Sequence, residues 1–266
     1  MKTQTISFTL LLTVTLILGS AFTTPNPATD AKSQDLLDAL VAVNGGWNAL
    51  LKLKDVEFTY TYDDKAKGID ISTERYIFGN ETSWAAYQQH EVNVMPGVDG
   101  QVYQCYMDGK PAITLNGEAV NDPQALGLTT FLRKANYYWF TMMYKLQDPG
   151  TSHTYLGTEE INGITYDKVS LKFEGTGKDA NDEYVLFFNP ETHLVDQFLF
   201  SLPAMGVNQP VLKMELEYEK IKGVYISTTR RGIYPNPETG EYQLGGEYTI
   251  TDLKFKNGFT QKDLAL

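Results

Sequence analysis

The chain has 266 residues, with 33 acidic side chains against 22 Lys and Arg, and its formal net charge is -11 at pH 7. An acidic surface repels polyanions, which excludes nucleic acid as a partner and limits any membrane contact to a peripheral one. The sequence holds 1 cysteine, Cys105. No internal disulfide is therefore possible, and packing alone must hold the fold.

The N-terminus has the layout of an export signal. Lys2 is followed by an apolar stretch over residues 6–18 and then by small residues. This order predicts a secretory signal peptide over residues 1–21 and a product that is extracytoplasmic and soluble after cleavage. Residues 22–34 are rich in Pro, Thr and Ala, which predicts a flexible leader. The remaining residues, 35–266, are expected to form one domain.

Two segments have the apolar spacing of helices. In residues 35–52 the apolar positions recur at helical spacing around a Gly-Gly interruption. Residues 122–146 start with Asp122, a helix-capping residue, and Pro123, which fits the first helical turn. The final turns of this second segment are apolar nearly all round, which is typical of a helix buried on several sides. We expect it to lie in the concave side of a sheet.

From Val56 the pattern changes to strict alternation, which predicts half-buried strands. Similar runs, joined by short Gly, Asn and Asp turns, recur as far as Phe255. A sheet of about 11 strands is larger than an open twisted sheet keeps without curling. The sequence thus predicts an α+β fold, a strongly curved antiparallel sheet forming an unclosed half-barrel of about 11 strands with the helices across its concave face. The strand residues expected to point toward the helices are Phe58, Tyr60, Val169, Leu171, Leu212, Met214 and Leu216.

The catalytic and metal-binding signatures are missing from the sequence. No Gly-x-Ser-x-Gly elbow is present, and the 3 histidines are too far apart to form a ligand pair on one helix. We therefore predict no catalytic residue, no metal site and no cofactor.

Arg75 stands out in the predicted strand over residues 69–78, because it shares odd positions with isoleucines. A guanidinium on a buried face needs a carboxylate or carbonyl partner. It either pairs structurally near the strand end, or it serves the function as a latch on the helix or a contact at a cavity mouth. The aromatic and Met residues over 137–143 leave a similar choice, between filling a core and lining a cavity.

The order of elements resembles a known family. Gly45-Gly46-Trp47 leads directly into Val56-Glu57-Phe58-Thr59-Tyr60, a helical insertion follows the first strands, and residues 249–254 form a closing strand. Over essentially the whole of residues 35–266 this layout resembles the periplasmic lipoprotein carriers of the Lol system and their secreted relatives. The resemblance implies a periplasmic protein whose unclosed barrel, under a helical lid, binds acyl chains. It also implies a strand Arg that helps to close the lid, and Arg75 lies in the second predicted strand.

Three functions remain open from the sequence. The leading hypothesis is a non-enzymatic carrier for a lipid or an acylated ligand. Its expected ligand-binding residues are Phe58, Tyr60, Arg75, Tyr138, Trp139 and Met142. The alternatives are a secreted hydrolase that uses carboxylates in the same hollow, and a module with a filled core that binds a cell-envelope protein. An apolar cavity would favour the carrier, converging carboxylates with raised pKa the hydrolase, and a solid interior the module.

Overall fold

A computed structural model of the chain describes residues 29–173, 183–203, 206–236 and 238–266, so the predicted signal peptide and residues 22–28 of the predicted leader lie outside the described residues. The elements in chain order are α1 (Ala31–Asn44), α2 (Gly46–Leu51), β1 (Asp55–Asp64), β2 (Gly68–Ile77), η1 (Phe78–Asn80), β3 (Thr82–His90), β4 (Val102–Met107), β5 (Lys110–Leu115), β6 (Glu118–Ala119), α3 (Pro123–Lys145), β7 (Thr151–Ile161), β8 (Ile164–Phe173), β9 (Glu183–Phe188), β10 (Val195–Leu202), β11 (Val207–Ile221), β12 (Val224–Pro235), β13 (Tyr242–Phe255) and η3 (Gln261–Asp263).

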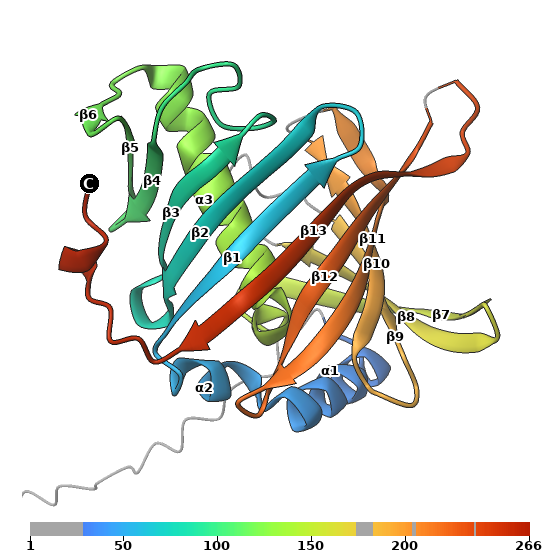
Figure 1. Cartoon of the computed structure of the whole chain (residues 1–266). Coiled ribbons are helices and arrows are strands. Elements are labelled where there is room, and N and C mark those ends of the chain that lie inside the picture. Colours follow the sequence, from blue (N-terminus) through green and yellow to red (C-terminus); the bar gives the residue numbers. More distant parts are fainter. Residues whose placement is uncertain (1–28, 174–182, 204–205, 237) are drawn as a thin grey trace, which may run out of the picture.

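The described strands form one antiparallel sheet of 13 strands in the order β6-β5-β4-β3-β2-β1-β13-β12-β11-β10-β9-β8-β7. The sheet curves strongly into an open half-barrel (Figure 1), which confirms the predicted fold class. Register shifts that mark bulges lie between Glu57 and Thr59 in β1 and between Ile71 and Ser72 in β2. Such bulges increase local twist and help the sheet to curl.

Helix α3 crosses the concave face behind β1 to β5 (Figure 1), as its apolar composition predicted. Its start follows the sequence signal, because the Asp122 side chain accepts a hydrogen bond of 2.8 Å from the Ala125 N–H and Pro123 occupies the first turn. The residues that α3 buries first recur every three or four positions, at Thr129, Arg133, Tyr137 and Phe140. In the last turns Thr141, Met142 and Tyr144 are buried as well, so this end of the helix is buried on more than one face.

Helices α1 and α2 lie at one end of the half-barrel, below the sheet in Figure 1. Helix α1 starts at Ala31, where the Asp30 side chain caps it by accepting the Ser33 N–H at 2.8 Å. The prediction of a flexible leader up to residue 34 is therefore wrong for residues 29–34, because the cap and a bridge from Thr29 to His153 join them to the domain. Gly45, with φ 83°, ends α1 in the left-handed region that glycine adopts without strain.

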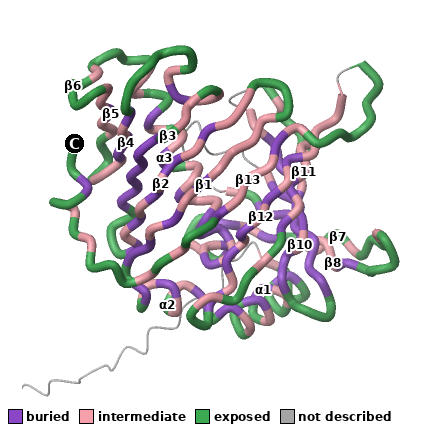
Figure 2. Tube along the Cα trace, in the orientation of Figure 1, coloured by how far each residue is buried: buried purple, intermediate pink, exposed green. Residues whose placement is uncertain are grey.

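The hydrophobic core lies between α3 and the concave face, and buried positions recur along the strands that contribute to it (Figure 2). One cluster joins α1 and α3 to β8–β11, and a second joins α2 and α3 to β1 and β2. Six of the strand residues predicted to face the helices are buried and Leu212 is partly buried, so the predicted register of these strands is confirmed. None of the described helices combines the length and apolar character needed to cross a lipid bilayer.

Candidate ligand-binding cavity

A cavity of about 1070 Å³ lies between the sheet and α3. Its wall is contributed by β1, β2, β3, α3 and the strands from β8 to β13, and it reaches the β1–β2 turn at Asp64, Ala66 and Lys67. Ala66, Lys67 and Phe131 are exposed, so the cavity opens to solvent at this end, opposite α1 and α2.

Aromatic side chains form much of the cavity wall. These residues are Tyr60, Tyr62, Tyr87, Phe131, Tyr138, Trp139, Phe173, Tyr184, Phe200, Tyr234 and Tyr248. Tyr62 and Tyr248 stack with ring centroids 4.4 Å apart. A Cβ at Gly245 would lie 2.4 Å from the Tyr234 ring, and one at Gly246 would lie 2.7 Å from the Tyr62 ring. The two glycines therefore leave the space in which these rings lie against the sheet.

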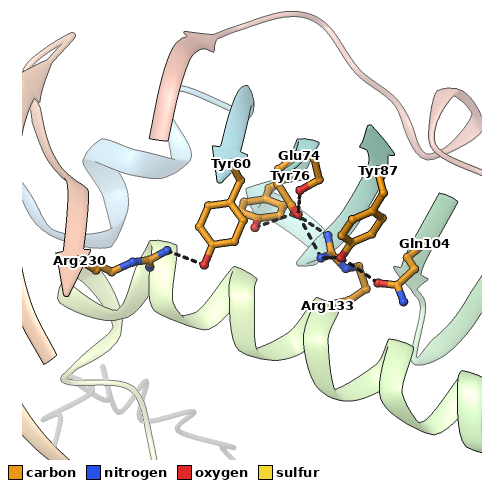
Figure 3. A network of polar contacts seen from close by, with 8 residues as sticks. Tyr60, Glu74, Tyr76, Tyr87, Gln104, Arg133 and Arg230 are labelled. Atoms are coloured by element: carbon orange, nitrogen blue, oxygen red, sulfur yellow. Dashed lines mark hydrogen bonds and ion pairs between the residues drawn. The ribbon is translucent and has the colours of Figure 1, made fainter. Parts of the chain in front are cut away.

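A buried ion pair joins α3 to the sheet beside the cavity (Figure 3). Arg133 on α3 donates from Nη1 to Glu74 Oε2 at 2.5 Å and from Nη2 to Glu74 Oε1 at 3.1 Å, and both side chains are fully buried. The Ser72 and Tyr76 hydroxyls also donate to Glu74, at 2.9 and 3.0 Å. The carboxylate is thus well compensated, as a buried charge must be.

The same network continues to β3 and β4 (Figure 3). Arg133 Nη2 donates to the Tyr87 hydroxyl at 2.9 Å, the hydroxyl donates to Gln104 Oε1 at 3.2 Å, and Gln104 Nε2 donates to Thr129 Oγ1 at 3.0 Å. Burial opposes the charge on Arg133, but the adjacent Glu74 carboxylate outweighs it and raises the pKa of Arg133. Burial likewise raises the pKa of Tyr87, so its hydroxyl stays protonated. These contacts fix one side of α3 to three neighbouring strands.

A second buried arginine, Arg230 on β12, lies on the other side of Tyr60 from the ion pair (Figure 3). Its Nη2 donates to the Tyr60 hydroxyl at 3.2 Å. Its guanidinium carbon lies 5.5, 5.9 and 5.7 Å from the ring centroids of Tyr60, Trp139 and Tyr248. Burial raises the pKa of Tyr60 to about 12, while the nearby Arg230 acts in the opposite direction.

The structure brings three of the six predicted ligand-binding residues to the cavity, since Tyr60, Tyr138 and Trp139 line it. Phe58 is a core residue instead, 2 % exposed and stacked on Phe140 with ring centroids 5.1 Å apart. Met142 is 1 % exposed and contributes to the core cluster with α1.

Arg75 lies on the opposite, convex face of β2. It donates to Glu57 Oε2 at 2.7 Å and packs over the rings of Trp84 and Phe259 at 4.7 and 4.8 Å. The face of β2 that points inward carries the even positions, including Ser72 and Glu74. The prediction that Arg75 sits at the cavity edge is therefore wrong, because the isoleucines that share its face are on the outside of the half-barrel.

Glu74, Arg133 and Arg230 are not among the site residues predicted from the sequence. Glu74 and Arg133 are 59 positions apart, and no local pattern connects them. Arg133 does fall on the buried stripe of the predicted helix, where a charged residue signals a buried partner. Arg230 occupies an inward position of a strand in the same way.

Two carboxylates line the cavity near its mouth. Burial opposes ionisation of Asp64, but hydrogen bonds from the Ala66 N–H and the Tyr62 hydroxyl outweigh it and lower the pKa of Asp64. Asp70 accepts hydrogen bonds from the Val92 N–H at 2.8 Å and the Asn93 N–H at 2.9 Å. Within the described residues, no group of three or more His, Cys, Asp and Glu side chains is placed to hold a metal ion.

No family model and no curated protein matches the sequence. Solved structures do match the fold. A LolA superfamily protein from Nitrosomonas europaea superposes with a TM-score of 0.52 and 11% identity, over 88% of this chain and 97% of that chain. A DUF1329 family protein from Desulfovibrio piger gives a TM-score of 0.49 and 14% identity, over 84% and 97% of the two chains. A putative outer membrane lipoprotein-sorting protein domain from Vibrio parahaemolyticus gives a TM-score of 0.49 and 10% identity, over 86% of this chain and 94% of that chain. The resemblance seen in the sequence therefore holds at the level of the fold, and this chain has the fold of the LolA superfamily.

Proposed function

We propose that this protein is an extracytoplasmic carrier, without enzymatic activity, that shelters a lipid or another apolar ligand in the cavity between the sheet and α3. The observation that carries the proposal is the cavity itself, about 1070 Å³ with a largely aromatic wall. This volume is at the upper end of the range of about 300–1,000 Å³ for small-molecule sites. The predicted signal peptide over residues 1–21 supports the location outside the cytoplasm.

The energetics of such a ligand are favourable. Burying a methylene is worth about 0.8 kcal/mol, so an acyl chain of about 14 methylenes gains roughly 11 kcal/mol before ordering terms are subtracted. The tyrosines of the wall add hydroxyls that can meet the polar end of an amphiphile. Tyr60, Tyr138 and Trp139 are the residues we expect to contact the apolar part.

The two alternatives receive less support. An interaction module with a filled core needs a solid interior. The large cavity between the sheet and α3 does not fit this requirement. A hydrolase that works with carboxylates needs a general acid of raised pKa, whereas the pKa of Asp64 is lowered and Asp70 is held by backbone and amide donors.

The direct test is to extract the purified native protein with organic solvent and analyse the extract by mass spectrometry. We expect a stoichiometric apolar compound that is absent from a denatured and washed sample. An empty protein that also fails to take up the neutral fluorescent probe N-phenylnaphthylamine would contradict the proposal.

A substitution that fills the cavity provides a second test. Ala135 lines the cavity, and Ala135→Trp should reduce uptake of the neutral probe by about tenfold or more, because the added indole occupies ligand volume. Leu128→Trp is the matched control, since Leu128 lies on the same helix, is 38% exposed and is not part of the wall. Trp139→Ala should also weaken uptake, because it removes an aromatic contact surface. Equal uptake by Ala135→Trp and Leu128→Trp would place the probe elsewhere.

A further inference from the structure

Arg230 is a buried cation without an anionic partner. It is 3% exposed, and among the described residues no carboxylate lies within 4.0 Å of its guanidinium. Its Nη2 donates to the Tyr60 hydroxyl, but Nε and Nη1 have no hydrogen-bond partner. A guanidinium stays charged at all accessible pH values, and an uncompensated charge is unfavourable in a protein interior.

The two other arginines near Arg230, Arg133 and Arg231, each pair with a glutamate carboxylate. Arg133, equally buried, lacks an acceptor only at Nε and is held by both oxygens of Glu74. Arg231, the next residue along β12, faces the outside and pairs with Glu217 and Glu247. Arg230 therefore departs from a pattern that the rest of the structure keeps, and such departures are typical of functional positions.

The space beside Arg230 adjoins the ligand cavity. A void of about 10 Å³ is lined by Arg230 together with Trp139, Phe140 and Tyr144. Trp139 also lines the large cavity, so the void and the cavity share a wall residue. The void has room for about one oxygen-sized atom, so it can admit a single oxygen of a carboxylate.

The rings around Arg230 suit this role as well. Tyr60, Trp139 and Tyr248 face the guanidinium and also line the large cavity. They stabilise the cation while the site is empty, because an aromatic face attracts a guanidinium. The same rings offer apolar surface to a hydrocarbon chain that begins beside the guanidinium.

We propose that Arg230 binds the carboxylate of an acidic amphiphile whose hydrocarbon chain occupies the large cavity. One of the unpaired nitrogens, Nε or Nη1, donates to a carboxylate oxygen, and the Tyr60 hydroxyl on Nη2 orients the guanidinium. This inference rests on the proposed function and specifies its ligand class. It assigns Arg230 a binding role and no part in any chemical step.

The test compares laurate with dodecanol, which share a chain length and differ in the head. Each is titrated against N-phenylnaphthylamine bound to the full mature chain. For the parent protein we expect laurate to displace the probe at a concentration about ten- to a hundredfold lower than dodecanol, the effect of charge-assisted hydrogen bonds. Arg230→Met should remove this preference, so that laurate and dodecanol displace the probe at similar concentrations, whereas Arg230→Lys should keep part of it.

Arg231→Met is the matched control, because it removes a cation one position away on the outer face, and it should keep the full preference for laurate. Thermal unfolding of each variant checks that it is folded. Equal displacement by laurate and dodecanol in the parent, or a preference that survives in Arg230→Met, would overturn the role of Arg230 and leave the carrier function standing. A parent protein that takes up no probe would overturn both.

Discussion

At the scale of single residues, the structural role of a charged side chain in this protein depends on how deeply it is buried. The pair of Glu74 and Arg133 holds α3 against the sheet, and its charges neutralise one another at full burial. Arg75 and Glu57 form a pair on the convex face, where both side chains remain about a quarter exposed, at 29% and 25%. Solvent weakens the second pair, and it tolerates the loss of a partner far better than the first.

This difference predicts the effect of removing each arginine. Arg133→Met should lower the free energy of unfolding by about 3–5 kcal/mol, because it leaves the Glu74 carboxylate buried without its cation. Arg75→Met should lower it by about 1 kcal/mol or less. Urea unfolding followed by circular dichroism measures both. The double variant Glu74→Leu/Arg133→Met should regain much of the loss, and a double variant no more stable than Arg133→Met alone would argue against an electrostatic origin.

His153 predicts a pH dependence of stability. It is 2% exposed on β7, its Nδ1 lies 3.1 Å from Thr29 Oγ1, and burial lowers its pKa. The folded state therefore keeps His153 neutral at a pH where the unfolded chain already takes up a proton. Because the unfolded state binds more protons in this window, stability falls as the pH drops below about 6.5, the ordinary pKa of histidine, and levels off below the folded pKa.

Chemical unfolding at a series of pH values between neutral and mildly acidic checks this expectation. His153→Gln should flatten the slope over that window. His193→Gln is the control, because His193 is exposed, and it should keep the slope of the parent. A slope that persists unchanged in His153→Gln would assign it to other groups.

At the scale of elements, the C-terminal segment after β13 covers part of the convex face. Asp55 at the start of β1 holds this segment by accepting the Asn257 N–H at 2.7 Å and the Gly258 N–H at 3.0 Å. Further along, Leu264 is fully buried in a cluster with Trp84 and Cys105. The sheet therefore has apolar surface on both faces at this edge, and the chain end shields the outer one.

This cover predicts the reactivity of the thiol. Cys105 is 2% exposed, and burial raises its pKa to about 11, so the parent should react very slowly with Ellman's reagent at mildly alkaline pH. Leu264→Ala should speed labelling by about tenfold or more, because a buried Leu→Ala change weakens local packing by about 2–5 kcal/mol. Leu266→Ala, two positions away and 45% exposed, should label like the parent. Equal rates for the two variants would contradict the shielding role.

At the scale of the whole molecule, the sequence predicted the architecture because local signals and global shape agree. The alternation in β1 and the cap at Asp122 are read within a few residues, and the number of strands makes curling necessary. The resemblance in element order predicted this fold, and the superposition on the LolA superfamily protein agrees with it.

The site was harder to predict, since its residues meet across the fold. In β2 the isoleucines occupy one face and Ser72, Glu74 and Tyr76 the other. Such a pattern predicts that the isoleucine face is buried, whereas in the structure the face with Glu74 is buried. A one-position error in assigning the face moves every side chain of a strand to the other side of the sheet. Only the partner Arg133, from a helix far along the chain, explains why the polar face is the buried one.

The two ends of the half-barrel differ, and this difference gives a bound amphiphile one orientation. In the described part of the molecule the exposed residues of the cavity wall lie at the β1–β2 turn and on α3 as far as Lys134, and Trp139 follows on α3 toward the end that α1 and α2 occupy. A linear amphiphile that lies along this cavity with one end beside Trp139 points its other end toward the exposed residues. An acid anchored at Arg230 would accordingly be stored with its tail toward the opening, and whatever receives the cargo would meet hydrocarbon before charge.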